Sequence, residues 1–386
     1  MSFDRLVDFL DYYLPMLGVP GSDTVIYKNH EEIFRHQSGF DSLRDRISIK
    51  SDLIYNVYSC TKLATAVAAL QLIERGELLL TDPVQIYFPE FKNITVKKRL
   101  EDGTVAAVPA RNTMLVKHLF SMTSGLDYDL NRPAIERVRA ATGGRCPTLD
   151  VIRALPEDPL LFEPGERYCY GLSHDVLGGI VEVLSGMSLG EYMRKNIFEP
   201  LGMSDTGFCL SENSCNRVAM QYSYDPIDRC PIEISSVENR YRLGTEYESG
   251  GAGLYSTVDD YILLADALAN GGVGKNGARI LSPATVKLFS KTLLNAEQNE
   301  YYQKMDKPGY NYGYGVRIAA ESALAGSLVP EGTFGWDGAR GSFTFSDPKN
   351  NIAVFHAEHM GGVNNILIPR LMNVIYSCIE DCVCCL

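Results

Sequence analysis

The chain has 386 residues, of which 45% are hydrophobic, so it is long enough to bury the core of one large domain or of two interleaved ones. Its 48 acidic and 36 basic side chains give a formal net charge of -12. Because such a chain repels polyanions, neither nucleic acid nor an anionic membrane is expected as a partner.

The first predicted elements are a helix and a hairpin. Residues 1–18 place Asp4, Asp8 and Asp11 among apolar residues at helical spacing, whereas a signal peptide has a basic flank and an unbroken apolar stretch. We therefore predict an amphipathic helix that belongs to the mature fold. Residues 23–27 and 32–39 flank a four-residue turn and are predicted to form a β-hairpin.

The strongest helix signal runs from Ser59 to Gly76. Apolar residues recur at three- and four-residue spacing, and Gly76 stands where a C-terminal cap belongs. The apolar run is far shorter than the roughly 20 residues that cross a bilayer, so no membrane span is predicted. Residues 82–240 are expected to be helices and irregular loops, with clear helices at 173–185 and 189–197.

The last part of the chain changes to short aromatic or β-branched runs at 313–319, 332–336, 341–346 and 352–357, followed by a helix at 363–384. Strands at both ends with helices between them predict an α+β fold. We expect an antiparallel sheet domain built from residues 1–57 and 240–386, and a mostly helical insertion domain at 58–239. An active site is expected in the cleft between them.

Ser59-Cys60-Thr61-Lys62 is the first motif with catalytic potential. On a helix, a lysine three residues after a serine lies on the same face, about 5–6 Å away by Cβ, and can accept the serine proton. The helix start also favours negative charge on the reacting oxygen and disfavours a protonated lysine. Alone the motif is a weak signal, since a serine at a helix start is usually an N-cap.

Residues 55–91 and four later segments together resemble the penicillin-binding-protein and class C β-lactamase-like serine hydrolases, which include esterases, transesterases and D-amino-acid peptidases. The later segments are HLFSMTSGL (118–126), FEPGERYCYGLSHDVLGGIVE (162–182), GGAGLYSTVDDY (250–261) and FGWDGARGSFTFSDP (334–348). The resemblance extends from about residue 20 to 360. It implies an acyl-enzyme on Ser59, Lys62 as base, and neither a metal nor an organic cofactor.

The resemblance also implies roles for other residues. In the family's Tyr-x-Asn motif a tyrosine shares the base role with the lysine; Tyr170 occupies that place, with Tyr168 as its competitor. Leu172 stands where the asparagine contacts the substrate amide. The Lys-Thr-Gly motif is replaced by Trp336-Asp337-Gly338, in which Gly338 is expected to let substrate lie against the strand. The backbone N–H groups of Ser59 and Ala339 would form the oxyanion hole.

These departures bear on the substrate. Leu172 and Trp336 each replace a polar anchor for β-lactams, and Asp337 adds negative charge. We therefore expect weak or no β-lactamase activity, and a carboxylesterase-like enzyme for small neutral or cationic esters. One alternative is a D-amino-acid amidase or DD-peptidase-like enzyme, with Asp337 binding the amino group. Another is a non-catalytic β-lactam- or ligand-binding sensor module.

Histidines and cysteines are predicted to be structural. His118 and His174 lack a recognisable His-Asp pairing, so no histidine base is assigned. Ten cysteines without an export signal indicate reduced thiols and a cytoplasmic location. The tail cysteines lack a nearby histidine and zinc-site spacing, so no metal is expected there: Cys378, Cys382, Cys384 and Cys385. The sequence leaves the oligomeric state open.

Overall fold

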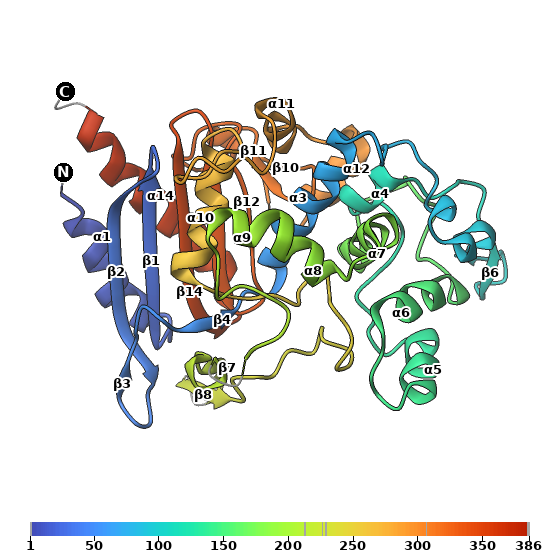
Figure 1. The fold of residues 1–386 in the computed structure, drawn as a ribbon, viewed down its shortest axis with the longest axis horizontal. Helices are drawn as coiled ribbons and strands as arrows, with labels where there is room; N and C mark the ends of the chain where they lie inside the picture. The colour runs from blue at the N-terminus through green and yellow to red at the C-terminus, as the bar shows by residue number, and fades with distance from the viewer. Residues whose placement is uncertain (1, 212–213, 226, 228–229, 306, 384–386) are drawn as a thin grey trace.

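A computed structural model describes residues 2–211, 214–225, 227, 230–305 and 307–383. Its central element is a 10-stranded sheet whose main path is antiparallel and draws strands from both ends of the chain (Figure 1). In spatial order that path is β10 (Tyr310–Tyr312), β11 (Arg317–Ala319), β12 (Phe334–Asp337), β13 (Gly341–Asp347), β14 (Ile352–Gly361), β1 (Gly21–Lys28), β2 (Glu31–Ser42) and β3 (Ile47–Ser48).

Helices cover both faces of this sheet. The N-terminal helical run, α1 (Asp4–Asp8), η1 (Phe9–Tyr13) and α2 (Leu14–Met16), packs with α14 (Asn364–Val383) against one face, and α10 (Val258–Ala269) packs against the other. Alternation along β1 explains the division: Ile26 belongs to the core under the terminal helices, whereas Val25 belongs to the core under α10. The sheet is therefore buried on both sides.

The helical part lies on the far side of α10 from the terminal helices (Figure 1). Its centre is α3 (Thr61–Glu74), which is buried from Thr61 to Leu72 and packs against α7 (Ser173–Ser185) and α8 (Leu189–Met193). A helix that is buried on all sides needs apolar or small residues all round, which the run of alanines, leucines and valine in α3 supplies. On α7 pack α4 (Val116–Phe120) and α6 (Thr148–Ala154), and α5 (Pro133–Ala141) packs on α6 at the edge of the molecule (Figure 1).

The α+β fold with an antiparallel sheet is confirmed, as are the N-terminal helix, the β1–β2 hairpin, α3 and α7. The single strand predicted at 313–319 is wrong: the chain turns at Gly313 and Gly315, so β10 and β11 pair with each other. Gly315 has a φ of +80°, which a β-branched residue would not tolerate in a continuous strand. The helix predicted at 363–384 is α14, and residue 384 lies outside the described residues.

The middle segment also contains two hairpins that the sequence pattern did not predict. They are β5 (Thr95–Arg99) with β6 (Val105–Pro109), and β7 (Gln221–Asp225) with β8 (Cys230–Ile234). Strand β7 pairs in parallel with β14, so a piece of the expected helical insertion joins the sheet. The domain limits at 57/58 and 239/240 remain a prediction.

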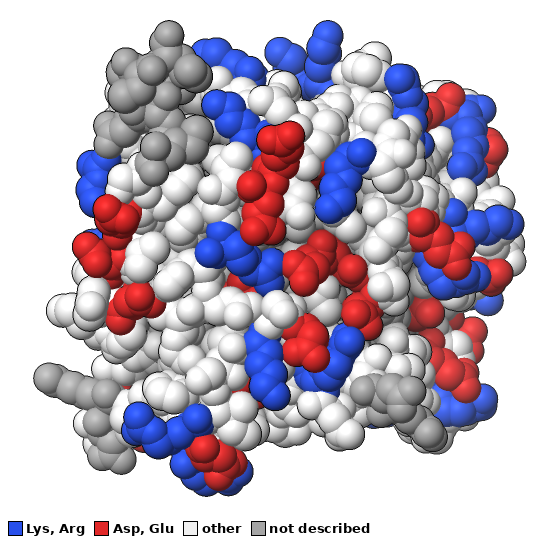
Figure 2. All heavy atoms as spheres, turned by 60° about the vertical axis from the view of Figure 1, so that its left-hand side comes forward, with Lys and Arg blue, Asp and Glu red and all other residues white. Residues whose placement is uncertain are grey.

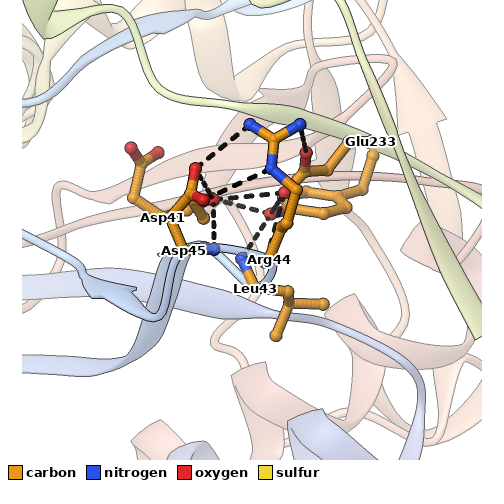
Figure 3. Close-up of polar contacts among 7 residues, drawn as sticks. Asp41, Leu43, Arg44, Asp45 and Glu233 are labelled. Atoms are coloured by element: carbon orange, nitrogen blue, oxygen red, sulfur yellow. Dashed lines mark hydrogen bonds and ion pairs between the residues drawn. The ribbon is translucent and has the colours of Figure 1, made fainter.

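The β7–β8 hairpin is held to the loop that ends β2 (Figure 3). The Tyr222 hydroxyl donates to the Asp41 carbonyl (2.9 Å) and accepts from the Leu43 N–H (2.9 Å). Glu233 accepts from the Ser42 hydroxyl (3.2 Å) and faces Arg44, whose Nη1 lies 3.7 Å from Oε2. The hairpin is therefore fixed at its base by several short contacts.

On the face shown in Figure 2, acidic and basic side chains are interspersed. Within the described residues, no helix is both long and apolar enough to cross a bilayer. Among the described residues, the free thiols include Cys60, Cys146, Cys169, Cys209, Cys215 and Cys230. Of the tail, Cys378 is buried in the core beside the sheet, and Cys384 and Cys385 lie outside the described residues.

Candidate active site

Ser59 lies in a sharp turn between the short strand β4 (Ile54–Asn56) and α3. The turn, η2 (Tyr58–Cys60), begins with Tyr58 at φ +44°, a left-handed conformation that costs energy for a residue with a side chain. The Tyr58 hydroxyl is anchored by the Gln221 side-chain oxygen (2.5 Å) and the Glu238 carbonyl (3.0 Å). This anchoring holds the strained turn and places Ser59, which is 8% exposed, in the first turn of the helical segment.

Lys62 is fully buried and directs its amine at Ser59. Its Nζ lies 3.3 Å from Ser59 Oγ, 2.8 Å from the Tyr128 hydroxyl and 2.7 Å from the Gly251 carbonyl. Within the described residues no carboxylate lies within ion-pair distance of Nζ. Burial lowers the pKa of Lys62 to about 7, although the negative charge of Asp175 acts in the opposite direction.

These contacts can hold the uncharged amine in place. A neutral lysine has two N–H groups and one lone pair, and Tyr128 and the Gly251 carbonyl provide two oxygens as acceptors. In that neutral state the lone pair is available to accept the proton of Ser59 Oγ, which lies 3.3 Å from Nζ. The arrangement can activate a serine at neutral pH without a histidine.

Tyr170 lies beside this pair, on the side of β12. The Trp336 indole N–H donates to the Tyr170 hydroxyl (3.0 Å), and Lys62 Nζ lies 4.4 Å from the Tyr170 ring centre. Burial raises the pKa of Tyr170 well above its usual value of 10, although hydrogen bonds from Ser59 and Trp336 act in the opposite direction. Tyr168 instead packs edge-on against Tyr302 and Tyr312, so of the two tyrosines Tyr170 is the one next to Lys62.

In the third motif, Asp337 and Gly338 have close neighbours within the fold. Asp337 accepts a hydrogen bond from buried Arg317 (2.9 Å) and another from the Asn364 amide (3.1 Å), so its charge is compensated and it does not stand as a free negative group. A Cβ on Gly338 would lie 2.6 Å from the Val57 carbonyl oxygen. Glycine is therefore required because the end of β12 passes close to the chain before Ser59. The substrate contact of Gly338 stays a prediction.

The remaining predicted residues divide into two groups. Ala339 is exposed next to the site, and its N–H has no acceptor in the part of the chain that the structure describes. Leu172 is only 2% exposed and belongs to the main core at the start of α7. The oxyanion role of Ala339 and the substrate contact of Leu172 both stay predictions.

Three contributors were missed from the sequence. Tyr128 follows the HLFSMTSGL segment by two residues, and Gly251 lies in the GGAGLYSTVDDY segment. A Cβ on Gly251 would lie 2.7 Å from both the Tyr128 hydroxyl and Asp175 Oδ2, so glycine is needed to bring its carbonyl to Lys62. Buried Asp175 accepts from Ser249 Oγ (2.7 Å) behind them. The sequence did contain a signal for Tyr128 and Gly251: each lies in or just after a segment that resembles the family and to which no role was assigned.

His118 and His174 lie in structural environments away from Ser59 Oγ. His118 Nδ1 accepts from the Leu115 N–H (3.1 Å), and burial lowers the pKa of His118 to about 4. His174 is fully buried in α7, and a Cβ on Gly315 would lie 2.3 Å from its ring. Neither ring hydrogen-bonds Ser59 within the described residues. No group of three or more potential metal ligands occurs in that same part of the chain.

A serine next to a buried, uncharged lysine, on an α+β scaffold, defines a serine hydrolase with a lysine base. The Beta-lactamase family model matches residues 6–357, and the chain belongs to that family.

Individual relatives agree with this assignment. The chain is 28% identical to esterase EstB of Burkholderia gladioli, over 97% of this chain and 95% of that protein. It is 29% identical to acyltransferase calJ of Penicillium decumbens, over 89% and 84% of the two chains. Among solved structures it is similar to EstCE1, described as a hydrolase with promiscuous acyltransferase activity, with 25% identity, a TM-score of 0.79 and coverage of 97% and 98%.

Proposed function

We propose that this protein hydrolyses small carboxylic esters through an acyl-enzyme on Ser59, with weak or no β-lactamase activity. The observation that carries the proposal is the Ser59–Lys62 pair: an amine with a pKa of about 7, 3.3 Å from the serine oxygen. A base with a pKa near the working pH is both deprotonated often enough and basic enough to accept the proton. The name of esterase EstB supports the substrate class.

The proposed steps use groups already present. Neutral Lys62 takes the proton of Ser59 as Oγ attacks the ester carbonyl. The N–H groups of Ser59 and Ala339 stabilise the tetrahedral oxyanion. Lys62 then returns the proton to the leaving alkoxide, and water repeats the sequence to release the acid. With its raised pKa, Tyr170 acts in these steps as a phenol that donates a hydrogen bond. Its share in the base role stays a prediction.

The amidase and peptidase alternative has less support. It requires Asp337 to bind a substrate ammonium group, yet the Asp337 carboxylate already accepts from Arg317 and Asn364. A substrate amine would therefore meet a carboxylate whose charge a buried guanidinium already compensates. The Trp336 side chain, 8% exposed and bonded to Tyr170, offers an apolar wall and not the cationic anchor of a Lys-Thr-Gly motif.

Acyl transfer is a second candidate, favoured by the names of acyltransferase calJ and of EstCE1. An acyl-enzyme reacts with an alcohol in the same way as with water, so one site performs both reactions. Adding a primary alcohol to an ester assay and measuring the new ester against the free acid separates transfer from hydrolysis.

The test compares wild type with Ser59→Ala, and with Ser51→Ala as a matched control at an exposed serine. We expect fluorophosphonate labelling and p-nitrophenyl butyrate turnover in wild type and in Ser51→Ala, and neither in Ser59→Ala. Nitrocefin and a D-alanine anilide should react far more slowly than the ester. Turnover that survives in Ser59→Ala would refute the mechanism, and labelling without turnover would indicate a sensor. The cytoplasmic location and the absence of nucleic-acid and membrane partners remain predictions.

A further inference from the structure

A cavity of 610 Å³ opens directly beside the Ser59 turn. Its wall includes Tyr58, which precedes Ser59, and Ala339, whose N–H is the proposed oxyanion donor. Tyr241 lines the same cavity, and its ring centre lies 5.2 Å from that of Tyr128, the hydrogen-bond partner of Lys62. A substrate whose carbonyl lies at Ser59 therefore has one of its ends in or next to this cavity.

The cavity carries more positive than negative charge. Its charged residues are Arg240, Arg340 and Glu238. Neither arginine has a carboxylate within ion-pair distance in the described part of the chain, although the whole chain has a net charge of -12. Arg317 on β11, by contrast, forms an ion pair with Asp337.

Arg340 is held in position by backbone and hydroxyl groups. Its Nη1 donates to the Tyr222 carbonyl (2.9 Å) and to Ser223 Oγ (3.0 Å), both on β7. A Cβ on Gly361 would lie 2.6 Å from this nitrogen, so glycine there leaves the room that the guanidinium occupies. Because β7 is itself clamped at its base (Figure 3), Arg340 is oriented before any ligand binds.

Arg240 comes from the loop that follows β8. Its Nη2 donates to the Tyr241 hydroxyl (2.9 Å), and its guanidinium stacks 5.0 Å from that ring. The fully buried Gln221 amide nitrogen fixes this loop, because its two N–H groups lie among the carbonyls of Ser235 (3.0 Å), Ser236 (2.9 Å) and Glu238 (2.8 Å). Two guanidinium groups therefore line one cavity next to the nucleophile, and each keeps N–H donors without a partner among the described residues.

We infer that Arg240 and Arg340 form an anion subsite, and that the enzyme prefers esters whose acyl or alcohol part carries a carboxylate. The inference rests on the proposed esterase function and replaces the expectation of neutral or cationic substrates, which depended on Asp337 being unpaired. Glu238 leaves one net positive charge in the cavity, which matches a carboxylate better than a dianionic phosphate. Guanidinium groups also bind carboxylates through paired N–H donors.

The test uses two ester pairs that differ only in charge. The first pair is mono-p-nitrophenyl adipate and its methyl-capped diester, which place the charge on the acyl side. The second is 4-butyryloxybenzoate and its methyl ester, which place it on the alcohol side. In wild type we expect kcat/KM to favour the carboxylate of at least one pair about tenfold, the size of one hydrogen bond to a charged group. Raising the salt concentration should reduce this preference.

Variants identify the source of the preference. Arg240→Gln and Arg340→Gln should each bring the ratio within a pair close to one, whereas Arg370→Gln, an exposed arginine on α14, should leave it unchanged. Glu238→Gln removes the opposing charge and should increase the ratio, a gain that misfolding cannot produce. Equal rates within both pairs, or a ratio that Glu238→Gln lowers, would overturn the inference while leaving the esterase intact. If the wild type hydrolyses none of the four esters, the esterase proposal is refuted instead.

Discussion

The pH dependence of ester hydrolysis reports directly on the state of Lys62. Burial moves the pKa of this amine from 10.5 to about 7. At pH 7 about half of the molecules then carry the neutral base, against roughly one in 3,000 for a lysine with its ordinary pKa. Since only neutral Lys62 can accept the Ser59 proton, kcat/KM should fall about tenfold per pH unit below the midpoint and level off above it.

The assay is kcat/KM for p-nitrophenyl butyrate from pH 5 to 9 at constant ionic strength, read at the isosbestic point of nitrophenol. Asp175→Asn should lower the pKa of Lys62. Asparagine still accepts hydrogen bonds from Ser249 and Tyr247 but lacks the charge that raises this pKa. The midpoint should therefore move to lower pH. A wild-type profile that is flat from pH 5 to 8, or an Asp175→Asn midpoint above that of wild type, would contradict this account of Lys62.

Three further substitutions test the surroundings of the pair. Tyr170→Phe removes a phenol donor and should lower kcat by about a hundredfold or more with little change in thermal stability, which steady-state kinetics and a melting curve would check. Gly338→Ala places a methyl group 2.6 Å from the Val57 carbonyl and should cost about 1–3 kcal/mol in urea unfolding; an unchanged midpoint would mean that β12 can move away. Arg317→Met leaves Asp337 without its cation and should destabilise by about 3 kcal/mol, and the double variant with Asp337→Asn should recover most of this in the same unfolding assay.

Local patterns in the sequence account for much of this fold. The periodicity of α3 and α7 is a property of ten or more consecutive residues, and both helices lie where it predicted them. The strand predicted at 313–319 failed because Gly313 and Gly315 turn the chain within an apolar run, and short apolar runs do not reveal such a turn. Hairpin β7–β8 was missed because its pairing depends on contacts with β14 and with the loop after β2.

The sequence by itself determined the Ser59–Lys62 spacing, because a three-residue separation on a helix places both side chains on one face whatever surrounds them. Only the tertiary structure decided the electrostatic environment of that lysine, and with it the pKa of its amine. Its bonds to Tyr128 and Gly251 come from segments 66 and 189 residues away. Its burial, and the lack of a carboxylate within ion-pair distance among the described residues, likewise come from the packing of distant segments. The same holds for Asp337, whose charge appears free in the sequence and is compensated by Arg317 in the fold. The electrostatic environment of a group depends on the charges and dipoles that lie near it in space, and a sequence pattern does not show which residues those are.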